Sequence, residues 1–189
     1  MKVSKLFVLL MLVLWSGSAV AQQWGVKTNL PYTATLTPNL GVELAVGKRS
    51  TIELTGGLNP FRLSHGQKMW KHWMATASYR YWFCDVYNGH FLGIHALGGQ
   101  FNVNGVNLSP MGFERDKRNQ GWGVGAGLSY GYQWVLSRRW NLEAEIGAGF
   151  VHLDYERYGC KSCAKKVDER TKNYFGVTKV GISLVYILK

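Results

Sequence analysis

The stretch Trp122–Trp134, with the sequence WGVGAGLSYGYQW, decides the fold. Every second residue in it is apolar or aromatic, and the residues between them are Gly, Ser or Gln. The apolar set consists of Trp122, Val124, Ala126, Leu128, Tyr130, Tyr132 and Trp134. Side chains of a β-strand point alternately to opposite faces, so a period of two over thirteen residues predicts a strand with one apolar and one polar face.

The same alternation recurs along the rest of the chain. In Tyr174–Leu188 we expect Tyr174, Thr178 and Val180 on the apolar face and Lys179 on the other. The remaining alternating segments are Trp24–Tyr32, Leu40–Val46, Ile52–Asn59, Trp73–Tyr81, a segment at 90–100 without a clean phase, and Trp140–Phe150. No helix of any length is expected. The sequence therefore predicts an all-β protein with eight antiparallel strands.

The number of aromatic residues decides which face points outward. Eight alternating strands fit either a soluble barrel with an apolar interior or an outer-membrane barrel with an apolar exterior. An eight-stranded interior is just wide enough for ordinary side chains. Outside its first 21 residues the chain carries 24 aromatic residues, too many for that interior. We therefore expect a single eight-stranded antiparallel transmembrane β-barrel with its apolar face toward lipid.

Charged residues recur on the opposite, polar face of the predicted strands. Three are positive and four negative: Lys27, Glu43, Glu53, Arg80, Glu143, Glu145 and Lys179. A Lys or Arg facing lipid would be destabilising, whereas in a narrow interior these charges can pair with one another. The pattern predicts a paired charge network in a closed lumen. Acid–base chemistry or a proton path is the alternative interpretation of four carboxylates in one lumen.

The N-terminal segment resembles an export signal. Lys2 and Lys5 precede the apolar run Leu6–Trp15, and Ala19 and Ala21 stand at the −3 and −1 positions of a signal-peptidase site. We expect residues 1–21 to be a cleaved secretory signal peptide and residues 22–189 to form the barrel domain. Cleavage lowers the formal charge from +11 to +9, because two Lys are lost. The expected location is the outer membrane of a Gram-negative bacterium.

Composition excludes several other classes of protein. With 47% hydrophobic and only 17% charged residues, the chain is not disordered. After the N-terminal segment, no apolar run is long enough for a transmembrane helix. The pI of about 9.7 does not indicate nucleic-acid binding, because the chain is expected to be exported. Outer-membrane lipid and lipopolysaccharide are the expected partners, and a larger outer-membrane complex is a further candidate.

Connection lengths predict the orientation. Three connections are short, Gly47–Ser50, Phe83–Gly89 and Leu136–Arg139, and three are long, Pro60–Lys71, Phe101–Gly121 and Asp154–Asn173. The first connection, Thr37–Asn39, is expected to be a tight turn. Outer-membrane barrels have short periplasmic turns and longer surface loops. We therefore expect three long surface loops, with both termini on the periplasmic side.

The last predicted surface loop contains two cysteines. Cys160 and Cys163 are expected to form a disulfide in an oxidising compartment, and Cys84 is expected to stay unpaired. A metal site would need a second pair of ligands at suitable spacing, which the chain does not have, and redox exchange is the third option. We expect no cofactor and no metal.

The same loop is basic. Its candidate contacts to lipid phosphates are Lys161, Lys165, Lys166, Arg170 and Lys172. Lys and Arg side chains at a membrane rim attract the phosphates of glycolipids, but ordinary solvated loop charge explains the pattern equally well.

An enzymatic role has little support in the sequence. His152 and Asp154 share a strand face, and Ser64 and His65 lie in a surface loop, but no local pattern joins them into a catalytic triad. We expect no catalytic residues. No Gly-rich loop precedes a helix, so the glycines do not form a nucleotide-binding motif.

Several long blocks resemble one family. They are WGVKTNLPYTATLTPNLGVELAVGKRSTIEL, KHWMATASYRYWFC, NGHFLGIHALGGQFNV, GYQWVLSRRWNLEAEIGAGF and NYFGVTKVGISLVY. The chain resembles the DUF3575-like family of small outer-membrane β-barrels, common in Bacteroidetes and of unknown function. The resemblance implies an outer-membrane barrel and supplies no activity. The expected role is a non-enzymatic structural or accessory component. The alternatives are a surface protein that binds a glycan, a host protein or lipid phosphate, and a lipid A-modifying enzyme.

Overall fold

The computed structural model describes residues 23–63, 68–104, 118–159 and 166–188. Within these ranges the fold is all-β, with one five-residue helix. The strands are β1 (Trp24–Asn29), β2 (Asn39–Gly47), β3 (Ser50–Asn59), β4 (Arg62–Leu63), β5 (Lys68–Trp82), β6 (Gly89–Asn104), β7 (Arg118–Val135), β8 (Trp140–Tyr158) and β9 (Lys166–Leu188), and the helix is α2 (Leu30–Ala34). Among these residues, no helix is both long and apolar enough to cross a membrane.

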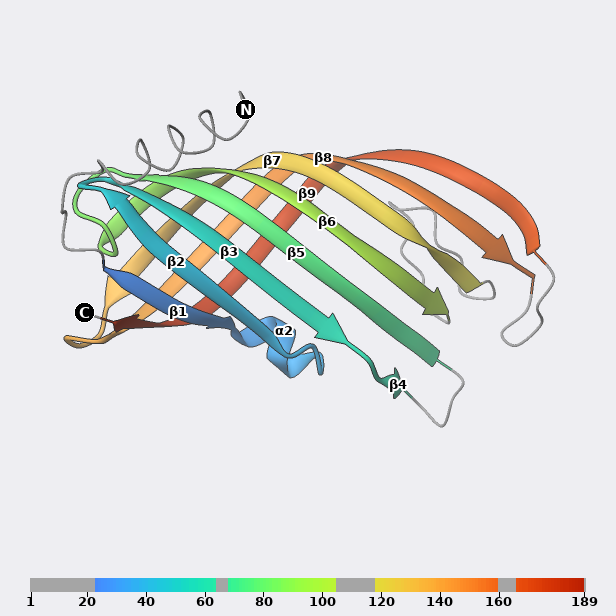
Figure 1. Ribbon diagram of the computed structural model, residues 1–189, viewed down its shortest axis with the longest axis horizontal. Helices are drawn as coiled ribbons and strands as arrows, with labels where there is room; N and C mark the ends of the chain where they lie inside the picture. Colours follow the sequence, from blue (N-terminus) through green and yellow to red (C-terminus); the bar gives the residue numbers. More distant parts are fainter. Residues whose placement is uncertain (1–22, 64–67, 105–117, 160–165, 189) are drawn as a thin grey trace, which may run out of the picture.

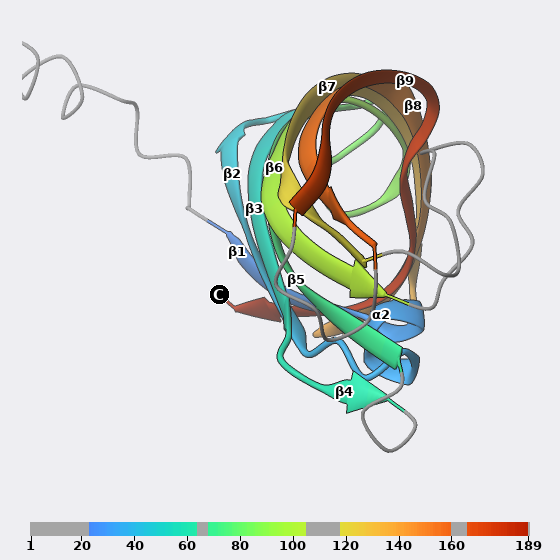
Figure 2. The same cartoon turned by 90° about the vertical axis from the view of Figure 1, so that its right-hand side faces the viewer.

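Eight of the strands form one ring-like antiparallel sheet (Figures 1 and 2). Each strand pairs with the next along the chain, except that β3 pairs directly with β5 and the two-residue β4 only extends the edge of β5. The ring closes where β9 returns to β1, with Trp24 opposite Leu188 and Asn29 opposite Ser183. The prediction of eight antiparallel strands is confirmed, and β4 is an addition to it.

The two ends of the ring differ, as the connection lengths predict. The short connections at 48–49, 83–88 and 136–139 lie at one end, beside the start of β1 and the end of β9, and we call this the turn end (Figure 1). The opposite end is the loop end. Its three long connections are shorter than predicted, because the strands extend further: β7 has 18 residues and β9 has 23.

The first connection differs from its prediction. β1 stops at Asn29 instead of continuing to Tyr32, and α2 replaces the end of the predicted strand. Pro31 lies in the first turn of this helix, where its missing N–H needs no partner, whereas within a sheet it would remove a ladder hydrogen bond. The Asn29 amide then donates to the Asn39 side chain at 2.6 Å, which ties the start of the connection to β2.

The predicted faces hold along most of the ring. In β7, Leu128 points outward and is 67% exposed, whereas Ser129 points inward and is buried. Apolar and polar residues do not alternate cleanly at 90–100, because both faces of this strand carry apolar residues. Phe91 is buried inside the ring and Leu92 is exposed outside it.

The phase predicted for the last strand is wrong in its first half. A register shift opposite Gly147 and Ala148 inserts one extra residue into β9, so Thr178 and Lys179 both point inward. Val177 is consequently exposed and Val180 keeps its outward position. The residues before the bulge lie on the opposite face from the one that strict alternation predicts.

Candidate functional site

The seven charged residues predicted for the interior meet in one cluster in the turn-end half of the ring. We call this set, Lys27, Glu43, Glu53, Arg80, Glu143, Glu145 and Lys179, the charged cluster. Its members come from β1, β2, β3, β5, β8 and β9. Six of them are buried, and the side chain of Lys179 is 17% exposed. The period-two pattern thus assigned every one of them to the correct face.

Arg80 lies at the centre of the charged cluster and is fully buried. Its guanidinium approaches the carboxylates of Glu43 at 3.2 Å and Glu143 at 2.8 Å, and it also pairs with Glu53 and Glu145. The same guanidinium lies over the ring of Phe91, 4.5 Å from its centroid. One cation therefore connects carboxylates from three different strands.

The two lysines complete the pairing. Lys27 lies 2.9 Å from Glu143 and 3.6 Å from Glu43, and it also contacts Glu53. Lys179 lies 2.8 Å from Glu53 and 3.0 Å from Glu145. As a result, every carboxylate of the cluster has at least two cationic partners. Such multiple pairing offsets the large cost of removing the charges from water.

The carboxylates raise the question of a metal or an acid–base site. Oxygens of Glu53, Glu143 and Glu145 lie within 4.8 Å of one another, a spacing that a cation could bridge. Arg80 pairs with all three carboxylates, so positive groups of the chain already lie between them. A cavity of about 50 Å³ adjoins the cluster, which is room for a few water molecules. The arrangement favours a structural ion network over a substrate site.

Aromatic side chains close the turn end below the charged cluster. Trp82, Tyr87 and Phe91 are buried there, with the rings of Trp82 and Phe91 4.8 Å apart. The Tyr87 hydroxyl lies 3.0 Å from the backbone carbonyls of Gln23 and Glu43. Burial raises the pKa of Tyr87, so its hydroxyl remains a neutral donor.

The interior becomes apolar on the other side of the cluster. Val151, Leu153 and Tyr155 continue the inward face that begins with the glutamates of β8, and Leu97 packs against them. Leu97, Val151 and Leu153 line a cavity of about 800 Å³, which we call the apolar cavity. The sequence does not predict this cavity by the alternation of Trp140–Phe150 alone, because that segment ends before Val151 and Leu153. Extending the odd-numbered phase of β8 past residue 149 would have indicated it.

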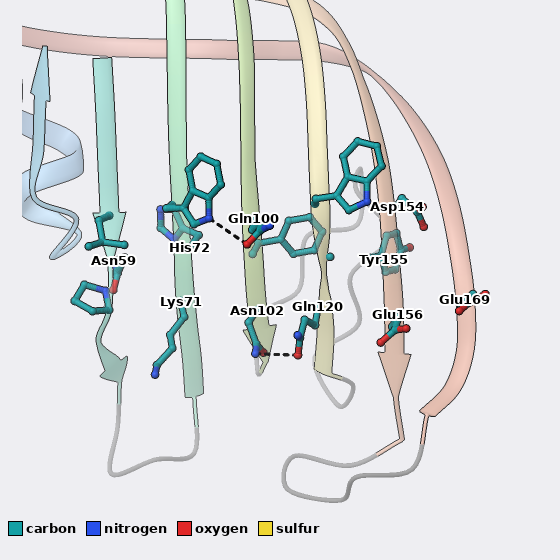
Figure 3. A pocket seen from close by; sticks show the side chains of 16 residues that line it. Asn59, Lys71, His72, Gln100, Asn102, Gln120, Asp154, Tyr155, Glu156 and Glu169 are labelled. Carbon is teal, nitrogen blue, oxygen red and sulfur yellow. Dashed lines mark hydrogen bonds between the residues drawn. The ribbon is translucent and has the colours of Figure 1, made fainter. Parts of the chain in front are cut away.

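A second pocket, of about 720 Å³, lies at the loop end (Figure 3). Its polar lining comes from β3 and from β5 to β9. The outward-facing part, which we call the polar rim, consists of Lys71, Gln100, Asn102, Gln120, Asp154 and Glu156. Dashed lines in Figure 3 mark two hydrogen bonds of 3.2 Å, from the Trp73 indole to Gln100 and from Asn102 to Gln120.

The predicted lipid-phosphate contacts are only partly described. Lys161 and Lys165 lie outside the described residues. Lys166, Arg170 and Lys172 belong to β9 and not to a loop, which corrects the predicted connection. Arg170 is paired with Asp168 at 2.8 Å.

The residues weighed for catalysis do not come together in the described structure. His152 is hydrogen-bonded to Asn173 at 2.8 Å, and Asp154 follows it on the same outer face. Ser64 and His65 lie outside the described residues. The geometry thus gives no nucleophile for His152 among the residues that the structure describes.

Cys160 and Cys163 also lie outside the described residues, so their disulfide stays a prediction. Cys84 is free and exposed in the connection between β5 and β6. We expect a thiol-blocking reagent to modify one cysteine before reduction and three after it, as counted by mass spectrometry. The variant Cys84→Ser should have no reactive thiol before reduction. Three reactive thiols in the unreduced protein would contradict the disulfide.

Fold and site together define an all-β protein with a ring-like eight-stranded sheet and a charge-paired interior. The family model for DUF3575, described as a protein of unknown function, matches residues 6–188. The chain belongs to this family. No curated protein matches it.

Proposed function

We propose that this protein is a non-enzymatic transmembrane β-barrel of the outer membrane of a Gram-negative bacterium, with a structural or accessory role there. The observation that carries the proposal is an exposed apolar band between two levels of aromatic side chains. Trp24, Trp134 and Trp140 lie at the turn-end level, and Trp73 and Trp122 lie at the loop-end level. Outer-membrane barrels have such a band, flanked by aromatic girdles.

The height of this band fits a bilayer. Trp122 and Trp134 are twelve residues apart on β7, or about 40 Å at roughly 3.3 Å per residue. With a strand tilt of about 35–45°, the band is about 30 Å tall, close to the hydrocarbon thickness of a membrane. The polar rim begins directly beyond Trp73 and Trp122, where lipid headgroups would lie.

The interior supports a barrel that does not conduct. The charged cluster and the aromatic layer of Trp82, Tyr87 and Phe91 fill the turn-end half of the ring. Because the carboxylates are engaged by cations of the chain, they are poor candidates for chemistry on a substrate. The proposed partners are therefore outer-membrane lipid and lipopolysaccharide around the band, and a larger envelope complex that the barrel would support.

Fractionation of the native host tests the location. We expect the mature chain to begin at Gln22, to remain in the outer-membrane fraction after carbonate extraction, and to migrate faster in unheated than in heated SDS gels. In planar bilayers the purified protein should give no discrete conductance steps. A periplasmic soluble chain would contradict the membrane proposal, and stable ion conductance would contradict the closed interior.

A further inference from the structure

The apolar cavity is built like a ligand site. Its volume of about 800 Å³ lies within the usual range for ligand pockets, about 300–1,000 Å³. We propose that it binds the aliphatic chain of an amphiphile, and that this chain enters sideways between α2 and β9. Nothing in the proposed structural role requires such a site.

The lining indicates a hydrocarbon ligand. Leu97 and Phe101 from β6 pack against Val151 and Leu153 from β8, and Tyr174 from β9 packs beside them. Among the described residues that line the cavity, none is Asp, Glu, Lys or Arg. A charged headgroup would therefore find no counterion inside, whereas an alkyl chain would be surrounded by apolar side chains.

The cavity is blind toward the turn end. Thr178 lies in its lining, and the Thr178 hydroxyl is hydrogen-bonded to His95 at 2.8 Å. Lys179, the next residue, belongs to the charged cluster that fills the following level. A chain that enters the cavity cannot continue through the ring, so the geometry describes a binding site and not a conduit.

The side opening lies where the ring changes from strand to helix. β1 pairs with β9 only from Ser183 to Leu188, and among the described strands none pairs with this edge of β9 before Ser183. α2 contacts β9 there instead. Val177 and Val180 face outward, are 50% and 52% exposed, and still line the cavity together with inward-facing Leu97. The cavity thus reaches the outer surface between α2 and β9.

The level of this opening identifies the source of the ligand. Val177 is opposite Ala148 of β8, which is opposite Leu128 of β7. Leu128 lies midway between Trp122 and Trp134, and two strand spacings along a tilted sheet shift the level by less than half the height of the band, so the opening lies within the apolar band. In the proposed membrane placement, a lipid chain can move from the bilayer into the cavity without crossing water.

Photolabelling tests the proposal. The full mature chain is folded into phosphatidylcholine vesicles that contain palmitic acid with a diazirine in its chain or, in a second arm, phosphatidylcholine with the same group in its acyl chain. After illumination, mass spectrometry locates the labelled residues. We expect label on inward-facing Leu97 and Leu153 in at least one arm, and the arm that labels them distinguishes a free fatty acid from a membrane phospholipid. Label confined to outward-facing residues such as Leu128 would overturn the proposal.

A variant that fills the cavity provides the matched comparison. In Leu97→Trp the larger side chain occupies the cavity, and we expect interior labelling to fall at least tenfold. Leu128→Trp makes the same change on the outer face and should leave interior labelling unchanged. Equal interior labelling in both variants would contradict the proposal.

Labelling in detergent micelles separates this inference from the membrane proposal. Binding in the cavity does not require insertion into a bilayer, so the inward-facing residues should be labelled by the diazirine acid in micelles as well. Interior label in micelles with no label in vesicles would contradict the membrane proposal and support the cavity. No interior label in either medium would overturn the cavity.

Discussion

We expect Arg80→Met to lower the free energy of unfolding by about 3–5 kcal/mol, which is the usual loss when one partner of a buried ion pair is removed. Arg80 is fully buried and pairs with all four carboxylates of the charged cluster. Without it, four carboxylates face only Lys27 and Lys179, and the excess negative charge stays buried without a partner. Urea unfolding of the vesicle-folded protein, followed by Trp fluorescence, measures the loss.

Two comparisons show whether the loss comes from charge pairing. Arg138→Met removes an exposed arginine from the turn at 136–139 and should change stability by less than about 0.5 kcal/mol. Adding Glu53→Gln and Glu143→Gln to Arg80→Met leaves Glu43 beside Lys27 and Glu145 beside Lys179. This triple variant should recover about 2 kcal/mol of the loss, because its two remaining carboxylates are matched by two lysines. Equal stabilities of Arg80→Met and Arg138→Met would contradict the role of the cluster.

The charged cluster could be predicted because it depends on only one property of the sequence. A period of two assigns Glu143 and Glu145 to the face opposite Ile146 whatever their partners are. The partners themselves were not predictable, since Arg80 and Glu145 meet only after β5 and β8 are placed in the same ring. Strand alternation thus identifies which side chains point into the ring, and the arrangement of the strands around the ring decides which of them come into contact.

The apolar cavity depends on two features that the alternation of apolar and polar residues does not predict. The bulge at Thr178 and Lys179 reverses the phase of β9, and a bulge is defined by the pairing with β8 and not by composition. Pro31 ends β1 early and leaves one edge of β9 to α2. A sheet interior disfavours proline, and Pro31 can be read from the sequence. The early end of β1 was therefore easier to predict than the bulge in β9.

Leu128→Arg is expected to shift the folding equilibrium in a membrane by about 2–4 kcal/mol, or about 30-fold or more. Leu128 is 67% exposed on the outer face of β7, midway between the aromatic levels at Trp122 and Trp134. At that depth an arginine has no counterion and no water within reach of its guanidinium. The fraction of chain that shows heat-dependent migration in SDS gels, after folding into vesicles, measures the effect.

Gln120→Arg is the matched control for that substitution. Gln120 lies on the same face of the same strand, eight residues nearer the loop end, within the polar rim. Its environment already includes Arg118, 2.8 Å away, and an arginine there extends into headgroups or water, so folding should change by less than about 1 kcal/mol. A depth-dependent cost distinguishes a bilayer from a partner protein, because a partner that covered the band would not reproduce the gradual decline from the midplane to the interface. If Leu128→Arg and Gln120→Arg fold equally well, the exposed apolar band does not face lipid.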